Sequence, residues 1–353
     1  MKVSIADYLS SGDSKGTPIG HGAKVLNEAC GLLREYNPTA FAYEETLKKI
    51  TSVKFTQLPY YVIADKNEKG IKEKIKDYWV KFFNIRYILH SNDSDIVWFT
   101  NVDRFLFFYL SLFMPKQKIA VTLYKDLKKD FTKRYGNNRF LKGFYNKGFD
   151  RVSLFIVTNR NLNYGKRQLF VPDYIYTDFY DRFRNKDKDN MTVCLGTNRR
   201  GKKETEELVR SFKGTQKRLK VVGKFLDDDM FDACKQYEDE YITVDNKTID
   251  DEEYYTLMGK AKFVALPYSM KGYHYSTSGV LQEAAFLGAI PIAPKGLLEF
   301  TTINGLGYEH IEDVPELIDE CYDSVSQDLT DYQENTVRNK ILDAFTRILN
   351  KER

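Results

Sequence analysis

The sequence predicts a protein of the α/β class, built as two domains with mainly parallel sheets. Short apolar runs that Pro or Gly stops alternate with longer stretches of helical periodicity, which is the pattern of strand–helix–strand units. A chain of 353 residues also exceeds one ordinary core and suits two domains of roughly 150 to 180 residues each. We place these domains at residues 1–180 and 181–330, and we expect a C-terminal helix at 331–353 that packs back on the first domain.

The first domain opens with a strand at 3–5, a glycine-rich loop and a helix at 23–33. This order is the opening of a mononucleotide-binding fold, although the glycines match neither a GxGxxG fingerprint nor a Walker A motif. A histidine in such a loop either contacts a ligand or is simply solvated. The loop residues that we single out are Gly16, Gly20, His21 and Gly22.

Strands and helices alternate through the rest of the first half. Strands are predicted at 60–64, 85–89, 96–99, 119–123, 152–157 and 169–171, and helices at 68–82, at 102–113 and between 126 and 146. Ligands of a parallel sheet bind beyond the carboxyl ends of its strands. The residues at those places are Thr100, Asn101, Tyr124, Lys125, Asp126, Thr158, Asn159 and Arg160.

Charge is distributed unevenly along the chain. Residues 1–172 carry 29 Lys and Arg against 16 Asp and Glu, a net charge of +13, and the remainder carries 25 against 34, a net charge of −9. A basic first half indicates an anionic partner such as a membrane leaflet or nucleic acid, unless the surface charge drifts without function. The stretches 74–87 and 104–118 mix aromatic and basic residues, which is typical of helices at a membrane interface. We expect 106–113 to be buried and the basic faces of 74–87 and 125–147 to be solvated.

The cysteines and the apolar runs point to a cytoplasmic protein, with the inner face of the membrane as a peripheral location. Cys30, Cys194, Cys234 and Cys321 have no metal-like spacing, so free thiols in a reducing compartment are expected. The first residues lack the apolar core of a signal peptide, and no apolar run reaches about 18 residues.

A second alternating series follows a polar linker at 181–190. A strand at 191–195 leads into a glycine-flanked loop and a helix at 204–212. The loop cations Arg199, Arg200 and Lys203 can neutralise a diphosphate, or the loop is merely charged and solvated. Further strands are predicted at 219–222, 241–244 and 263–266, and helices at 228–237, 250–259, 314–326 and 331–350.

The stretch 263–298 reads as strand, loop, helix and strand. Ser278 and Gly279 begin its helix, whose N-terminus offers unpaired N–H groups and partial positive charge to a diphosphate. Gly279 would let a ligand approach the main chain closely, and Glu283, one turn further on, can reach sugar hydroxyls. The alternative is an ordinary capped helix of an α/β domain. A second strand is expected at 290–293.

These motifs resemble the retaining GT-B glycosyltransferases of the family 4 type, a group with many bacterial polysaccharide enzymes. The likeness is carried by the cationic loop at 193–203, the segments 248–254 and 261–267, the helix with Ser278-Gly279 and Glu283-Ala284, and Gly288 three residues before Pro291. It extends to the architecture of most of the chain and implies two Rossmann-like domains that face each other across a cleft.

The resemblance also implies roles for single residues. Main-chain groups at Ser278, Gly279 and Val280 would bind the donor diphosphate beside the cationic loop, and Glu283 would bind the ribose. Val244 and Thr248 would flank the base, and the loop from Gly16 to Gly22 would close over the donor. The family has a sugar-contacting glutamate eight residues before Glu283, where this chain has Tyr275. Arg199, Lys203 and Tyr275 are therefore the candidate catalytic residues.

We expect a hexosyltransferase-type enzyme that acts without a metal or another cofactor. It would move a sugar, with retention, from a nucleotide diphosphate sugar to a glycan or a polyprenyl-diphosphate-linked acceptor. The alternative is a catalytically inactive glycosyltransferase-like subunit that binds substrate or a partner enzyme, which Tyr275 favours. Nucleic-acid binding is disfavoured because no recognition motif accompanies the basic charge.

Overall fold

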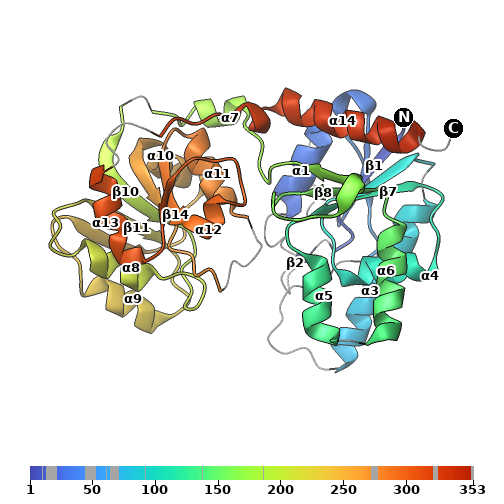
Figure 1. Ribbon diagram of the computed structural model, residues 1–353, viewed down its shortest axis with the longest axis horizontal. Coiled ribbons are helices and arrows are strands. Elements are labelled where there is room, and N and C mark those ends of the chain that lie inside the picture. The colour runs from blue at the N-terminus through green and yellow to red at the C-terminus, as the bar shows by residue number, and fades with distance from the viewer. Residues whose placement is uncertain are drawn as a thin grey trace. The chain divides into compact units, whose positions relative to one another are not determined.

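The computed structural model describes residues 1–9, 11–12, 22–43, 53–60, 62–63, 71–91, 93–136, 138–185, 187–271, 277–320 and 325–350. Its contacts divide the chain into two compact units (Figure 1). The first unit comprises Met1–Thr158, Leu162–Val171 and Glu334–Arg353. The second unit comprises Asn159–Asn161 and Pro172–Gln333.

The boundary between the two units lies where the side chains begin to be buried in the second core, and it does not lie in the polar segment 181–190. The chain passes to the second unit after Val171, whereas the sequence placed the boundary after residue 180. Tyr174 and Tyr180 account for the difference, because both are buried in a core of the second unit. The last helix, α14 (Glu334–Asn350), belongs to the first unit, where its Phe345 packs edge-on against Trp98 with ring centroids 6.0 Å apart.

The first unit is built on a parallel sheet of seven strands in the order β4-β3-β1-β6-β7-β8-β9. The strands are β1 (Val3–Ala6), β3 (Thr39–Ala42), β4 (Lys54–Gln57), β6 (Ile96–Phe99), β7 (Lys118–Leu123), β8 (Leu154–Val157) and β9 (Gln168–Phe170). Besides α14, its helices are α1 (Gly22–Leu32), α3 (Ile71–His90), α4 (Arg104–Leu112), α5 (Leu127–Tyr135) and α6 (Arg139–Asp150). A separate pair joins β2 (Ser11–Gly12) to β5 (Val62–Ile63).

The structure differs from the elements that the sequence predicts for the first unit in two places. The strand predicted at 85–89 is the second half of α3, because Ile85, Ile88 and Leu89 lie on the buried face of a continuous helix. Asn84 on the same face donates Nδ2 at 3.1 Å to the carbonyl of Tyr8, which lies two residues after β1. The strands β3 and β4 escaped prediction because one is four small or mixed residues and the other is a mostly exposed edge strand.

The second unit has a parallel sheet of six strands in the order β12-β11-β10-β13-β14-β15. The strands are β10 (Asp189–Leu195), β11 (Leu219–Gly223), β12 (Ile242–Asn246), β13 (Ala261–Ala265), β14 (Ile290–Pro294) and β15 (Leu306–Tyr308). The helices are α7 (Asp178–Asp181), α8 (Thr205–Phe212), α9 (Asp228–Lys235), α10 (Asp251–Lys260), α11 (Gly279–Phe286), α12 (Lys295–Leu298) and α13 (Val314–Glu320).

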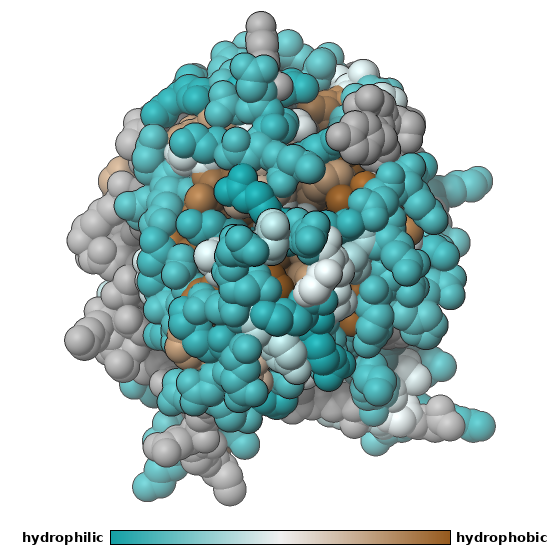
Figure 2. Space-filling model, turned by 90° about the vertical axis from the view of Figure 1, so that its left-hand side faces the viewer, coloured by the Kyte–Doolittle hydropathy of each residue, from teal (hydrophilic) through white to brown (hydrophobic). Residues whose placement is uncertain are grey.

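Both faces of this second sheet are covered. Val193 and Leu195 of β10 belong to one buried cluster and Cys194 to another, because successive side chains of a strand point to opposite faces. Figure 2 shows the side on which Figure 1 draws the second unit, where the surface is mainly hydrophilic and hydrophobic residues form small separate patches. The predicted fold class, two Rossmann-like α/β domains, is confirmed.

Candidate functional site

The cationic loop of the second unit has a defined shape. Gly196 and Gly201 take the left-handed backbone conformation, with φ of 87° and 73°. Between them the wholly buried Asn198 donates Nδ2 to the carbonyl of Gly196 at 3.2 Å and accepts from the hydroxyl of Thr205 at 2.9 Å. The loop is therefore held at both ends, beside the last residue of β10 and the first of α8.

The two arginines of this loop differ in their surroundings. Arg200 is paired with Asp229 at 2.9 Å and with Glu206 at 3.7 Å. Arg199 is exposed, and within the described ranges its side chain makes no hydrogen bond or ion pair. Arg199 is consequently the more available of the two for an anionic ligand.

Lys203 is connected to the start of α11 through Tyr268. Its ammonium group donates to the carbonyl of Leu195 at 2.9 Å and lies 5.8 Å from the centre of the Tyr268 ring. Burial lowers the pKa of Lys203. The hydroxyl of Ser278 donates to the Tyr268 hydroxyl at 3.3 Å. One tyrosine thus contacts both parts of the predicted diphosphate site.

The first turn of α11 is uncapped among the described residues, because Ser278 makes no side-chain hydrogen bond to it. The structure gives Gly279 a packing role as well. A methyl group on Gly279 would lie 2.2 Å from Cε2 of Tyr174, so the glycine makes room for this ring. Tyr174 is held there by its N–H, which donates to Gln282 at 2.8 Å.

Glu283 is clamped by two tyrosines. Its carboxylate accepts from the hydroxyl of Tyr254 at 3.0 Å and from that of Tyr255 at 2.8 Å. Burial raises the pKa of both phenols, and the neighbouring carboxylate raises it further, so both remain donors at neutral pH. Only 5 % of Glu283 is exposed. The carboxylate of Glu283 therefore has a fixed orientation.

The remaining predicted residues are less informative. Val244 is wholly buried and its N–H and C=O are bonded to Glu238 and Lys235, whereas Thr248 is exposed. Gly22 begins α1, and a methyl group there would lie 2.9 Å from Oδ2 of Asp7. Those that lie outside the described residues are Gly16, Gly20, His21 and Tyr275.

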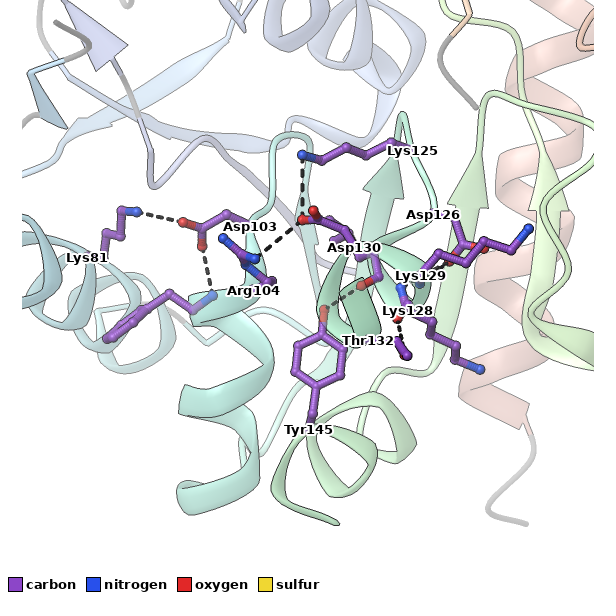
Figure 3. A network of polar contacts seen from close by, with 12 residues as sticks. Lys81, Asp103, Arg104, Lys125, Asp126, Lys128, Lys129, Asp130, Thr132 and Tyr145 are labelled. Atoms are coloured by element: carbon purple, nitrogen blue, oxygen red, sulfur yellow. Dashed lines mark hydrogen bonds and ion pairs between the residues drawn. The ribbon is translucent and has the colours of Figure 1, made fainter. Parts of the chain in front are cut away.

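The first unit gathers charged residues where strands end (Figure 3). Asp103 caps α4 by accepting from the N–H of Phe105 at 2.9 Å, and it also accepts from the Tyr8 hydroxyl and pairs with Lys81, each at 2.6 Å. Asp130 lies 3.6 Å from Arg104 and 3.8 Å from Lys125. Sequence reasoning singled out Lys125 but missed Asp103, although an aspartate directly before a helical run is an N-cap signal.

In the part of the chain that the structure describes, no three His, Cys, Asp or Glu side chains lie together in a way that could hold a metal ion. Metal independence stays a prediction. Within the same ranges no helix is both long and apolar enough to cross a bilayer.

Comparison with known proteins agrees with the two-domain class that the fold defines. No family model matches the sequence, and no curated protein matches it. Solved structures do match: a glycosyltransferase from Rickettsia africae has a TM-score of 0.61 at 13% identity, with 99% of each chain covered. AviGT4, a glycosyltransferase involved in avilamycin A biosynthesis, has a TM-score of 0.57 at 12% identity and covers 99% of this chain and 98% of its own.

A putative UDP-N-acetylglucosamine 2-epimerase from Listeria monocytogenes is similar too, with a TM-score of 0.59 at 12% identity over 99% of this chain and 98% of its own. At these identities the likeness shows the fold, which is that of the two-domain GT-B proteins, and leaves the reaction to be argued from the site.

Proposed function

We propose that the protein is a glycosyltransferase that takes its sugar from a nucleotide diphosphate sugar. The observation that carries this proposal is Tyr268, which contacts both Lys203 and Ser278. Through it a cationic loop and an uncapped helix N-terminus lie together in one unit, and both favour the same ligand group, a diphosphate. The two glycosyltransferases among the similar structures support the reaction class.

The chemistry follows from where charge develops. As the glycosidic bond breaks, negative charge grows on the departing diphosphate, and groups that stabilise it there lower the barrier. Arg199 and Lys203 supply positive charge, and the first N–H groups of α11 supply donors of fixed direction. Such a site needs no metal. In a front-face mechanism with retention the leaving phosphate assists the acceptor, so no separate base is required.

We propose that the first unit binds the acceptor, and its charge indicates what kind of acceptor this is. Its net basic charge supports an anionic acceptor, such as a glycan on a polyprenyl diphosphate, at a membrane surface. Lys125 and Arg104 stand where strands of this unit end, which is the side on which parallel sheets bind ligands. A catalytically inactive subunit remains the second candidate, since Glu283 has both oxygens engaged by tyrosines.

Titration calorimetry with UDP, GDP and their sugars tests the donor site. Arg199→Ala should weaken nucleotide diphosphate binding about 10- to 100-fold, because it removes a charge-assisted hydrogen bond. Arg200→Ala is the matched control and should have a smaller effect, since Arg200 is occupied by Asp229 and Glu206. The melting temperature of Arg199→Ala should be unchanged.

The outcomes separate the candidates. Binding of a nucleotide sugar together with its slow hydrolysis or its transfer to an acceptor supports the enzyme. Binding without any turnover supports the inactive subunit. If no nucleotide diphosphate binds at all, the enzyme is wrong, and of the inactive subunits only one that binds a partner enzyme is left.

A further inference from the structure

The outer face of α3 leaves large aromatic side chains in solvent. Trp79 is 57 % exposed, although a tryptophan on a helix of a soluble domain is usually covered. Tyr78, Ile75 and Phe83 on the same helix are also exposed. The opposite face carries the buried residues, so α3 is anchored to the first unit by one side and presents the other outward.

Two of these side chains, Trp79 and Phe83, are connected through ring contacts to the end of α4. The ring of Phe83 lies 6.1 Å from that of Tyr60 and is stacked on that of Trp79 at 5.7 Å. The ring of Phe82 lies 6.3 Å from that of Trp79 and 5.8 Å from that of Phe113, measured between ring centroids. Phe113 is the residue directly after α4. Met114, the next residue, is 80 % exposed. We name this surface the aromatic patch, and its members are Tyr60, Trp79, Phe82, Phe83, Phe113 and Met114.

The charges beside the aromatic patch have one prevailing sign. The helix α3 carries five Lys and Arg against two Asp and Glu, and the exposed cations on and beside it are Lys72, Lys74, Lys76, Arg86 and Lys116. Such a helix matches the description of one that lies in a membrane interface, with aromatic side chains among the headgroups and lysines at the anionic surface. A second copy of this chain would bring the same cations together, which repels.

We propose that the aromatic patch inserts into the interfacial region of an anionic lipid bilayer and that the cations of α3 hold it there. The inference rests on the proposed function for its membrane setting, but its test needs no sugar transfer. It also corrects the expectation of burial for 106–113. Within this range Leu106, Phe107, Tyr109, Leu110 and Ser111 are buried, but Leu112 and Phe113 are exposed, and Phe113 joins the patch.

Cosedimentation with vesicles is the direct test. The protein should bind vesicles of phosphatidylcholine with about a third phosphatidylglycerol, bind pure phosphatidylcholine at least 10-fold more weakly, and lose binding in high salt. The double variant Trp79→Ser with Phe83→Ser should lose at least 10-fold in vesicle affinity. Phe140→Ser is the matched control and should bind as the wild type does, because Phe140 is 72 % exposed on α6 but lies outside the patch.

Tryptophan fluorescence provides an independent readout. The chain has two tryptophans, and Trp98 is 4 % exposed, so a blue shift on adding anionic vesicles must come from Trp79. Trp79→Phe should abolish the shift and retain vesicle binding. No shift in the wild type, or an equal loss of binding in Phe140→Ser, would overturn the proposal. The proposal would also be overturned if sedimentation equilibrium showed the wild type to be a dimer and the double variant to be a monomer.

Failure here is distinguishable from failure of the donor site. UDP affinity measured without vesicles should be the same in the wild type and in the double variant. A protein that binds UDP but no vesicles contradicts only the membrane surface, and one that binds vesicles but no nucleotide contradicts only the donor site.

Discussion

At the scale of single residues, the second unit buries lysine ammonium groups against backbone carbonyls. Lys188 donates to the carbonyl of Gly259 at 2.5 Å and to that of Leu287 at 2.6 Å. These carbonyls stand at the C-terminal ends of α10 and α11, where cations are favourable and carbonyls lack helical partners. Burial, with a contribution from nearby Arg184, lowers the pKa of Lys188 to about 8.

This pKa predicts how stability changes with pH. The pKa of Lys188 in the folded protein lies below the ordinary value of 10.5, so between about pH 8 and pH 10.5 the unfolded chain binds a proton that the folded chain has released. The free energy of unfolding of the wild type, relative to Lys188→Met, should therefore rise from pH 7.5 to pH 9.5. The rise should stay below about 1.4 kcal/mol per pH unit.

Urea denaturation at several pH values measures this difference. Lys260→Met, which changes an exposed lysine at the end of α10, is the matched control for the loss of one lysine. The lowered pKa of Lys188 in the folded protein would be contradicted if the free energy of unfolding of the wild type, relative to that of Lys188→Met, stayed constant or fell with rising pH.

Residues of the site were predictable from sequence to different degrees. Arg199, Lys203, Ser278 and Glu283 follow from local patterns, since a loop after a strand and a helix start can be recognised from neighbouring residues. Tyr268 lay inside a stretch that was singled out, but its contact with Lys203 spans 65 positions of chain and has no local signal. Local sequence also could not show that Gly279 makes room for the ring of Tyr174.

At the scale of elements, close packing of α4 and α6 organises the first core. Phe107 of α4 stacks on Phe149 of α6 with ring centroids 4.0 Å apart. This approach is possible because Gly148 brings the α6 backbone against α4. A methyl group on Gly148 would lie 1.9 Å from the carbonyl oxygen of Phe107.

Gly148→Ala should therefore destabilise the protein by about 1–3 kcal/mol, because a methyl group must force the two helices apart. Thermal and urea denaturation measure the loss. Gly143→Ala is the matched control on the same helix, with nothing within 4 Å of the added methyl group. It should stabilise by up to about 1 kcal/mol through helix propensity. Equal effects of the two substitutions would contradict the packing argument.

Elements were predicted best where their burial is one-sided or complete. The strand β6 is recognisable from an uninterrupted apolar run, and β7 and β10 from apolar runs that one threonine interrupts. The pattern predicts a strand at the end of α3, because the five residues 85–89 are apolar apart from Arg86 and such a short segment fits a strand or a helix. Only its continuity with the preceding helical turns decides between the two.

At the scale of the whole molecule, the chain passes from the first unit to the second after Val171, apart from the earlier short segment Asn159–Asn161, and returns to the first unit with α14. This helix buries Val337, Ile341, Ala344, Phe345 and Ile348. The first unit is therefore incomplete without the last residues of the chain, although more than 150 positions separate them from Val171.

Phe345→Ala should cost about 3–5 kcal/mol, because it opens a cavity beside Trp98. Amide hydrogen exchange should show faster exchange in β6 to β9 and unchanged exchange in β10 to β14. Thr346→Ala, at an exposed neighbouring position, should change stability by less than about 0.5 kcal/mol. Loss of protection mainly in the second unit would contradict the assignment of α14.

The sequence by itself determined the class of the protein and most of its elements, because periodicity, caps and breakers act over a few residues and are written locally. It also indicated one loop and one helix as the candidates for holding a diphosphate. Only the tertiary structure decided the unit boundary, the tyrosine that connects Lys203 to Ser278, the clamp on Glu283 and the ring contacts of the aromatic patch. Each of these depends on contacts between residues far apart in the chain, and such contacts form only when whole elements pack.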